Sequence, residues 1–335
     1  MPMTSRLACA TALTAALATP TLAQNVPVVF GSNWLAQAEH GGFYQSVADG
    51  TYAACGLDVT IQPGGPQVNN RALMIAGKVD YHMGGNLLEA FSAAQEGIPI
   101  VAVAAAFQKE PQVILTHPGK VKSFEELKTL EKILIGDQGN ASFYQWMKAA
   151  YGFTDEQREV YTYNPAPFIA NEAWGMQGYL SSEPYFVAKE TGWEPDVWLI
   201  ADAGYSTYST LIETMADTVA TKPVEVTCFV EGSIKGWYTY LYGDNSAANA
   251  MIKTDNPEMT DEAIAYAIEK MKSAGIVDSG DTETMGIGAM TEAKVKDFFD
   301  KMVTAGVVSG DLDWSATINT TFVNKGVGME LKPKM

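Results

Sequence analysis

Apolar and polar positions along the first half of the chain follow two periods in turn. Short apolar or alternating runs predict strands, and runs with a helical period predict helices between them. The predicted strands are residues 26–32, 57–62, 79–83 and 98–107, and the predicted helices are residues 43–55, 69–77 and 87–95. Strands separated by helices of this length favour right-handed βαβ units and a mostly parallel sheet.

A second unit of the same kind begins near Val113. Its predicted strands are residues 132–136, 159–163, 174–179 and 197–201, and its predicted helices are residues 124–130, 142–151 and 183–191. Ser123 and Glu126 have the spacing of a capping box for the first of these helices. The last third is mainly helical, because Thr260 and Thr291 each precede an amphipathic run that ends at a glycine.

No linker rich in Pro, Gly or Ser separates the two α/β units. We therefore predict an α/β fold with two lobes, each a mostly parallel sheet flanked by helices, joined by two crossing strands near residues 111–116 and 218–226. The predicted lobe 1 comprises residues 24–112 and 218–335, and the predicted lobe 2 comprises residues 113–217.

The first 23 residues have the pattern of a signal peptide. Arg6 supplies the positive charge, residues 7–18 are apolar, and Thr21-Leu22-Ala23 resembles a cleavage site. The apolar run is shorter than a membrane-spanning helix requires, and Cys9 lies too close to Arg6 for a lipoprotein signal. We expect cleavage after Ala23 and export of the remaining chain.

Composition and charge narrow the function classes. Hydrophobic residues make up 47% of the 335 positions and charged residues 18%, which argues against intrinsic disorder. The formal charge is -17, and only three residues are arginines: Arg6, Arg71 and Arg158. So acidic a chain would repel nucleic acids and anionic membrane surfaces, and neither is expected as a partner.

Familiar catalytic and cofactor motifs are absent. The sequence has no phosphate-binding loop, dinucleotide fingerprint, H-E-x-x-H, G-x-S-x-G or C-x-x-C pattern, so no cofactor is expected. A metal site built from Glu39, His40 and His82 is disfavoured, because adjacent residues rarely ligate one ion well. Cys55 and Cys228 could pair in an oxidising compartment, but a core of this size needs no crosslink, so we expect two buried free thiols.

Candidate binding residues lie in the loops that follow the predicted strands. Ligands of open α/β sheets bind beyond the carboxyl ends of the strands. The corresponding loops are residues 34–42, 64–70, 84–86, 137–142 and 181–185, which combine small residues with a few polar groups. The aromatic residues nearby are expected to form flat walls, although Phe43 and Tyr144 could equally belong to the core.

These loops carry the resemblance to a known family. The segments are residues 34–59, 64–69 (GGPQVN), 76–85 (AGKVDYHMGG), 97–103 (GIPIVAV), 123–127 (SFEEL) and 178–184 (GYLSSEP). Taken in order, they resemble the NMT1/THI5-like (SsuA/TauA/ThiY-like) substrate-binding proteins of ABC importers. The resemblance covers most of the chain and is weak after about Lys253.

The resemblance implies a type II periplasmic-binding-protein fold in which a hinge closes two lobes over a solute. It also implies a monomer in the periplasm that delivers its solute to the transmembrane subunits of an ABC permease, without catalysis. The candidate ligand-binding residues are Trp34, His40, Gly41, Phe43, Tyr44, Gly65, Asn69, Gly85, Asn86, Phe107, Asn140, Ser142, Trp174, Glu183, Tyr185 and Tyr205.

Three kinds of solute remain open, and we rank them by charge. A neutral or weakly cationic planar nitrogen heterocycle, similar to the pyrimidine precursor of thiamine, comes first because few arginines are present to bind an anion. An alkanesulfonate or taurine comes second and a flavin third. An enzyme is the alternative of another class, because His40 falls where related fungal pyrimidine synthases carry a reactive histidine. Those enzymes also have a cysteine-rich motif, whereas the segment around Cys228, VTCFVEG, contains a single cysteine.

Overall fold

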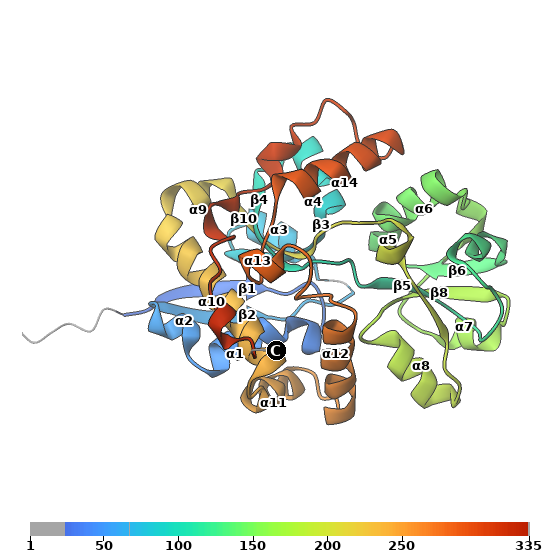
Figure 1. Cartoon of the computed structure of the whole chain (residues 1–335), viewed down its shortest axis with the longest axis horizontal. Coiled ribbons are helices and arrows are strands. Elements are labelled where there is room, and N and C mark those ends of the chain that lie inside the picture. Colours follow the sequence, from blue (N-terminus) through green and yellow to red (C-terminus); the bar gives the residue numbers. More distant parts are fainter. Residues whose placement is uncertain (1–23, 67, 334–335) are drawn as a thin grey trace, which may run out of the picture.

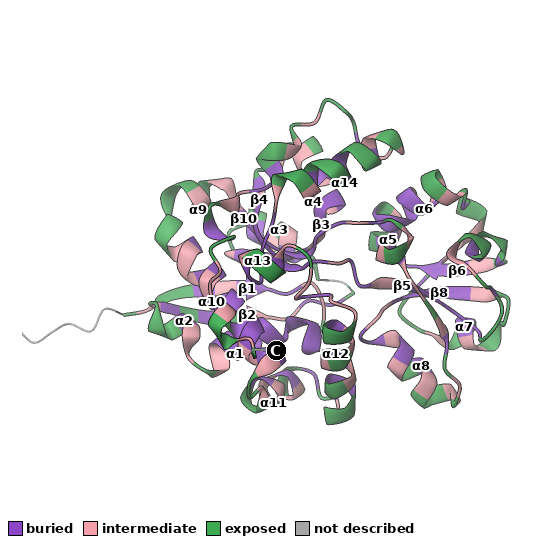
Figure 2. Ribbon diagram, viewed as in Figure 1, coloured by how far each residue is buried: buried purple, intermediate pink, exposed green. Residues whose placement is uncertain are grey.

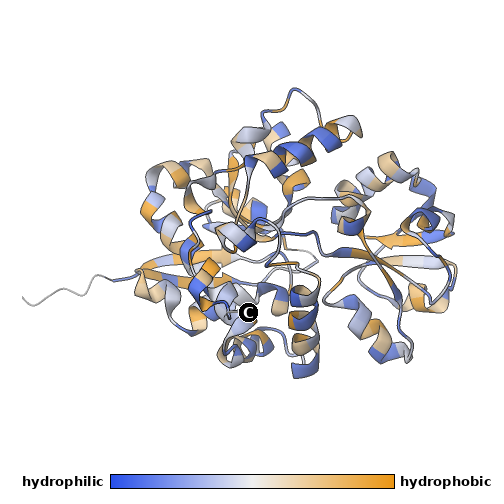
Figure 3. Cartoon of the chain, in the orientation of Figure 1, coloured by the Kyte–Doolittle hydropathy of each residue, from blue (hydrophilic) through white to orange (hydrophobic). Residues whose placement is uncertain are grey.

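The computed structural model describes residues 24–66 and 68–333 and shows two α/β lobes side by side (Figure 1). The predicted signal peptide lies outside the described residues. Each lobe is built on a five-stranded sheet, and helices cover the faces of both sheets. Apolar strands lie inside and the outer helix faces are polar and exposed, as Figures 2 and 3 show.

The first sheet has the strand order β2-β1-β3-β10-β4. Its strands are β1 (Val26–Gly31), β2 (Leu57–Gln62), β3 (Tyr81–Asn86), β4 (Ile100–Phe107) and β10 (Ser209–Met215). The helices α3 (Asn70–Ile75) and α4 (Leu87–Gln95) connect these strands, and the side chains of Asn69 and Asn86 cap them. The four predicted strands of this half and the predicted helices over residues 69–77 and 87–95 are therefore confirmed within a few residues.

The second sheet has the order β7-β6-β8-β5-β9. Its strands are β5 (Gln112–Thr116), β6 (Lys132–Ile135), β7 (Arg158–Val160), β8 (Trp174–Tyr179) and β9 (Asp196–Leu199). The helices of this lobe are α5 (Asp137–Ala141), α6 (Phe143–Tyr151), α7 (Ala166–Ala170) and α8 (Glu183–Thr191), with the 3-10 helices η2 (Phe124–Thr129) and η3 (Asp155–Gln157). Residues 137–140, predicted as a turn, thus form a short helix.

The expectation of mostly parallel sheets is confirmed, because four of the five strands in each sheet run in the same direction and one strand is antiparallel. In the first sheet β10 runs antiparallel to β3 and β4, and in the second sheet β5 runs antiparallel to β8 and β9. Each of these strands enters its sheet directly from the other lobe. Only a crossover connection within one sheet forces neighbouring strands to be parallel, so β5 and β10 are free of that constraint.

The chain crosses between the sheets twice. The first crossing, residues 108–111, joins β4 to β5, and the second, residues 200–208, joins β9 to β10 through the 3-10 helix η4 (Ile200–Ala203). β10 already pairs with the first sheet, so the return lies before Ser209 rather than at residues 218–226. Those residues instead belong to α9 (Ala216–Thr221) and the start of α10 (Pro223–Tyr242).

The C-terminal helices pack on the first lobe. They are α11 (Ser246–Asp255), α12 (Asp261–Ser273), α13 (Thr282–Met285) and α14 (Glu292–Thr304), followed by the 3-10 helices η5 (Trp314–Thr317), η6 (Thr320–Phe322) and η7 (Met329–Leu331). Thr260 and Thr291 cap α12 and α14 as predicted. The 20-residue helix α10 was not foreseen, because apolar side chains occur on most of its circumference and give little helical period.

The first connection also differs from the prediction of one helix over residues 43–55. The structure has the 3-10 turn η1 (Ala38–His40), then α1 (Gly41–Ala48) and α2 (Thr51–Ala54), separated at Gly50. Gly50 has φ of 74°, a left-handed conformation that only glycine adopts without strain. The helix therefore starts two residues earlier than expected and is interrupted.

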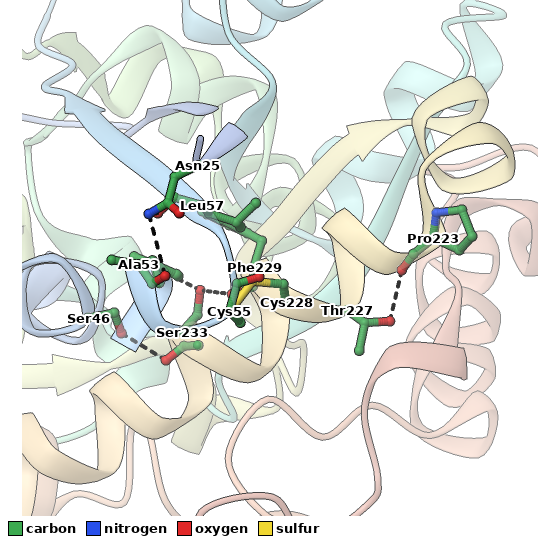
Figure 4. The surroundings of a disulfide bond; sticks show 12 residues. Asn25, Ser46, Ala53, Cys55, Leu57, Pro223, Thr227, Cys228, Phe229 and Ser233 are labelled. Carbon is green, nitrogen blue, oxygen red and sulfur yellow. Dashed lines mark hydrogen bonds between the residues drawn. A yellow bond between two sulfur atoms is a disulfide. The ribbon is translucent and has the colours of Figure 1, made fainter. Parts of the chain in front are cut away.

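Cys55 and Cys228 form a disulfide, which corrects the expectation of two buried free thiols (Figure 4). Their Cα atoms are 5.9 Å apart, and the bond joins the end of α2 to α10 within the first lobe. Cys55 is exposed rather than buried. The 173 residues between the two cysteines hide this proximity in the sequence, because the pairing depends on how α10 packs back against α2.

Candidate functional site

A cavity lies between the two lobes, at the ends of strands from both sheets. It contains about 870 Å³ of empty space, its open mouth included. The first lobe contributes the segment after β1 and the end of β3, and the second lobe contributes α5, the segment after β7 and the end of β8. Glu110, at the first crossing, and Gln112, at the start of β5, complete the lining. This is where ligands of open α/β sheets are expected to bind.

Three contacts join the lobes around this cavity. The Ser181 hydroxyl donates a hydrogen bond to Glu39 Oε1. Gln138 Nε2 donates to Glu89 Oε1 at 3.1 Å. The rings of Trp34 and Tyr163 meet with their centroids 4.4 Å apart. Since one partner of each pair belongs to each lobe, the structure shows a closed arrangement of the cleft.

Four glutamates line the cavity, and two of them, Glu39 and Glu110, are almost completely buried. Burial raises the pKa of Glu110 to about 8, although Asn86 Nδ2 donates a hydrogen bond to it at 2.9 Å. Burial likewise raises the pKa of Glu183 to about 7 against the opposing hydrogen bond from the Tyr179 backbone N–H at 2.6 Å. The pKa of Glu39 is raised by burial, which outweighs the hydrogen bond from Ser181.

The fourth carboxyl, Glu89, lies beside a buried ion cluster. Arg71 Nη2 is 3.1 Å from Glu213 Oε1 and 3.9 Å from Glu89 Oε2, and His82 Nδ1 is 3.1 Å from Glu213 Oε2. Burial opposes ionisation of Glu213, but the charge of Arg71 and the hydrogen bond to His82 keep its pKa below the usual value. Burial raises the pKa of Glu89 despite Arg71. Arg71 is therefore engaged mainly with Glu213.

His40 is held as a neutral ring by two hydrogen bonds. The Gln37 backbone N–H donates to Nδ1 at 3.2 Å, so Nε2 carries the proton and donates to Asn33 Oδ1 at 3.1 Å. Burial lowers the pKa of His40 to about 3. Both nitrogens are occupied by the protein, so the ring serves to shape the cavity and offers neither a free base nor a charge.

Aromatic rings form much of the cavity wall. The five aromatic side chains of the lining are Trp34, Phe143, Tyr161, Tyr163 and Tyr179. Tyr163 has φ of 62°, an unfavourable conformation for a bulky residue that costs on the order of 1–3 kcal/mol. This conformation accompanies the contact of its ring with Trp34 and with Tyr161, whose ring centroid is 5.1 Å away. Such strain is typical of residues that clamp a ligand.

An outer chamber adjoins the cavity beyond Trp34 and Tyr163, which line both spaces. Gly65, Asn69 and Arg71 contribute to this outer chamber from the first lobe, and Asp137 contributes from the second. The Trp34–Tyr163 pair thus lies between the inner cavity and the outer chamber.

Half of the candidate residues predicted from the sequence line one of these two spaces. Those of the inner cavity are Trp34, His40, Gly85, Asn86, Ser142 and Glu183, and those of the outer chamber are Trp34, Gly65 and Asn69. They come from five loops and both lobes, so the structure brings together residues that are up to 149 positions apart in the sequence, since 183 − 34 = 149.

The other candidates lie outside both linings. Phe43, Tyr44, Phe107 and Tyr205 are buried in the core, and Tyr44 donates a hydrogen bond to Asp255. Trp174 packs on the core of the second lobe, and the ring centroid of Tyr185 lies 5.4 Å from that of Tyr266. Gly41 accommodates the ring of Tyr240, and Asn140 lies within α5. A residue type predicts that a side chain is aromatic or small, but not toward which face of its element it points.

Several lining residues were not among the candidates. Glu89 comes from α4, Glu110 from the first crossing and Gln112 from the start of β5. Tyr161 and Tyr163 follow β7, and Gln177 belongs to β8. Glu110 carried one recognisable feature, an acidic residue between a fully apolar strand and Pro111. The tyrosines had none, because alternation within a predicted strand does not distinguish the cleft from the core.

The comparison with protein families matches residues 37–246 to the NMT1/THI5-like family, which is more than half of the chain. The chain belongs to the NMT1/THI5-like family. The matched residues include most of the inner cavity, from Gln37 to Glu183, so the family match and the site coincide. No curated protein sequence matches the chain.

Solved structures of other proteins share the fold of this chain. The alkanesulfonate-binding protein SsuA from Xanthomonas axonopodis pv. citri bound to MOPS has a TM-score of 0.63 at 11% identity, covering 89% of this chain and all of that protein. The ligand binding component of an ABC-type import system from Staphylococcus aureus has a TM-score of 0.60 at 11% identity, covering 89% and 98%. The desulfurization enzyme DSZB has a TM-score of 0.56 at 11% identity, covering 91% and 100%.

At these identities the likenesses establish the fold and not the activity. The chain has the periplasmic-binding-protein fold, which confirms the predicted fold class, and this fold also occurs in an enzyme. Among the described residues, no helix has the length and apolar character needed to cross a membrane. In the same part of the chain, no group of three His, Cys, Asp or Glu side chains is placed to hold a metal ion.

Proposed function

We propose that this chain is the periplasmic solute-binding component of an ABC importer and that it captures a small planar nitrogen heterocycle by hinge closure. The observation that carries the proposal is the wall of the inner cavity, where aromatic rings and carboxyl groups from both lobes converge without a Lys or Arg among the lining residues. The predicted signal peptide and the fold of the ABC-type neighbours support export and delivery to a permease.

The side chains of the cavity wall are complementary to a planar nitrogen heterocycle. Aromatic faces bury a flat ring, and each well-placed ring pair adds about 0.5–1.5 kcal/mol beyond the area buried. Carboxyl groups accept hydrogen bonds from ring amino groups or from a protonated ring nitrogen. Solute that contacts both lobes shifts the population toward the closed arrangement, which the permease then recognises.

The alternatives find less support in this wall. Alkanesulfonates, which the SsuA neighbour is named for, call for cationic or N–H donors, whereas the one arginine of the outer chamber is engaged with Glu213. A flavin would have to extend past Trp34 into the outer chamber. An enzyme using His40 would need a free ring nitrogen, and both are occupied by Gln37 and Asn33.

A binding screen with matched variants tests the proposal. Calorimetry with substituted aminopyrimidines, taurine, an alkanesulfonate and riboflavin should show stoichiometric binding of an aminopyrimidine and no turnover. Trp34→Ala should weaken that binding by about tenfold or more, the loss of one ring face and its buried area. Trp314→Ala, outside the cavity, is the control and should bind normally. Tightest binding of a sulfonate or a flavin, or chemical conversion of the heterocycle, would contradict the proposal.

A further inference from the structure

The inner cavity has more carboxyl groups than the protein neutralises. Glu39, Glu89, Glu110 and Glu183 all line it, and the lining contains no Lys or Arg. Arg71 lies beside Glu89, but it is closer to Glu213, at 3.1 Å against 3.9 Å. The hydrogen bonds to the remaining three carboxyls come from uncharged groups, among them Ser181, Asn86 and the Tyr179 backbone.

From this imbalance we infer that the solute enters the cavity as a cation and that its binding releases a proton held there by the carboxyl groups. The inference rests on the proposed function and specifies the charge of the solute in the same site. Unpaired ionised carboxylates are costly in a dehydrated cavity, so the empty site has to retain protons or take up a cation.

The surroundings of Glu110 show that it has no other source of charge compensation. It is 2% exposed and lies at the first crossing, beside Asn86 from the end of β3. The charge of Glu89 raises the pKa of Glu110, and the charge of Glu110 contributes to the raised pKa of Tyr179 and Tyr205. None of these three groups is a cation. Burial accordingly raises the pKa of Glu110 to about 8, so the group holds a proton at neutral pH.

Glu183 and Glu39 form a second group of carboxyls from opposite lobes. Beside burial, the negative charge of Glu39 raises the pKa of Glu183, at the start of α8. The charge of Glu183 in turn contributes to the raised pKa of Tyr161 and Tyr163. The charge of Glu39 also contributes to the raised pKa of Tyr179 and Tyr240. His40, next to Glu39, is neutral. Two carboxyls that line the same cavity and act on each other cannot both ionise easily, and a cation between the lobes relieves this repulsion.

An unused amide group indicates that a ligand completes the cavity. Gln177 is 7% exposed, and its Oε1 accepts a hydrogen bond from the Gly136 backbone N–H at 2.8 Å, which fixes the orientation of the amide. Among the described residues none accepts a hydrogen bond from its Nε2, although Gln177 lines the cavity. The Gln177 amide therefore offers a free donor beside the carboxyl groups of the wall, which suits a cation that also has a ring nitrogen with a free lone pair.

The exchange of charge is balanced. In the empty protein a carboxyl holds its proton, and the solute is in water as an ammonium or protonated ring. On binding, the carboxyl ionises, its proton passes to the solvent, and the cation pairs with the carboxylate. The net charge of the cavity stays the same, so the closed cleft never encloses an uncompensated charge.

Two pyrimidines that differ only in the substituent at position 5 test whether the charge of the solute, rather than its shape, determines the affinity. The probes are 4-amino-5-aminomethyl-2-methylpyrimidine, cationic near neutral pH, and its neutral 5-hydroxymethyl analogue. We expect the aminomethyl compound to bind at least about tenfold more tightly, as charge-assisted hydrogen bonds allow. Calorimetry in buffers of different ionisation enthalpy should show proton release at about pH 7, with affinity falling by up to about tenfold per pH unit per proton as the pH is lowered from 8 to 6. Equal or tighter binding of the neutral probe, or binding without proton release, would overturn the inference.

A measurement on the empty protein separates this inference from the proposed function. Infrared spectroscopy at neutral pH should detect protonated carboxyl groups that are lost in Glu110→Gln and Glu183→Gln but kept in Glu172→Gln, a control whose side chain is 71% exposed. If no pyrimidine binds but these bands are present, the proposed solute class is wrong, whereas the protonated cavity that the inference requires is supported. If the bands are absent in the wild-type protein at pH 6, the cavity holds no proton to release and the inference fails.

Discussion

Glu110 illustrates at the residue scale how position changes the chemistry of a side chain. The carboxyl group of Glu172 is exposed, and the hydrogen bond from Lys120 lowers its pKa. The carboxyl group of Glu110 lies in the cleft and holds a proton at neutral pH. Water solvates the first and is excluded from the second, so the charged form is disfavoured only in the second. Both residues are glutamates, so the difference in protonation state comes from the environment of each side chain.

This difference predicts a pH-dependent effect of Glu110→Gln on stability. The pKa of Glu110 is about 8 in the folded chain against 4.5 for the free side chain, so between these values the folded state binds more protons and the stability contributed by this group falls as the pH rises. Gln is neutral and keeps an acceptor for Asn86. The melting temperature of the variant relative to wild type should therefore increase from pH 5 to pH 8. Glu172→Gln should show no such increase, and parallel curves for wild type and Glu110→Gln would contradict the raised pKa.

At the element scale, the contact between α1 and α10 depends on glycines on facing surfaces. A Cβ atom added at Gly236 would overlap Ser46 Oγ and the Gly42 carbonyl oxygen, and one added at Gly42 would overlap the ring of Trp237. Ser46 also donates a hydrogen bond to the Gly232 carbonyl at 2.8 Å. The two backbones therefore approach more closely than any larger residue would allow.

Gly236→Ala tests this packing. Helix propensity alone predicts that alanine stabilises α10 by up to about 1 kcal/mol, whereas the overlap predicts a loss of about 1–3 kcal/mol or more. We expect a net loss in the free energy of unfolding, measured by urea denaturation. Gly310→Ala is the matched control, because its Cβ would meet only Val303 at 3.5 Å and its backbone is not left-handed. A stabilised Gly236→Ala would show that α1 and α10 pack less closely than described.

At the scale of the whole molecule, both crossings are fastened to the same C-terminal segment. Lys294 of α14 donates to the Gln108 carbonyl at 2.8 Å in the first crossing, and its Nζ lies 4.1 Å from the ring centroid of Tyr208 in the second. Gln108 Nε2 donates to the Ala289 carbonyl at 3.0 Å, and Tyr208 accepts from the Thr291 backbone N–H at 3.0 Å. Movement of one lobe against the other has to occur beside these anchors.

Lys294→Met should loosen both crossings together. The substitution retains the apolar stem but removes a half-buried charged hydrogen bond and a cation–π contact, a loss of about 1–3 kcal/mol. Hydrogen exchange should become faster in peptides that cover residues 105–112 and 200–210. Lys296→Met on the same helix, where the side chain is 56% exposed and pairs with Asp300, should leave both peptides unchanged. Unaltered exchange in Lys294→Met would show that Lys294 does not anchor the hinge.

The order of strands and helices could be predicted from the sequence because it depends on short-range patterns. The β2 prediction matches its bounds, Leu57–Gln62, and Asn69, Thr260 and Thr291 cap helices where expected. The ordered loop segments also sufficed to place the chain in its family. Capping and hydrophobic period are determined by neighbours within a few residues, so the sequence contains them in full.

The composition of the cleft, the disulfide and the direction of β10 depended on the tertiary structure. Trp34 and Glu183 were foreseen, but Phe43 and Tyr205 point into the core, and Glu110 becomes a site residue only where the first crossing passes the cavity. Cys55 meets Cys228 only after α10 packs against α2. The direction of a side chain and the meeting of distant segments are set by packing between elements, and no local pattern in the chain records them.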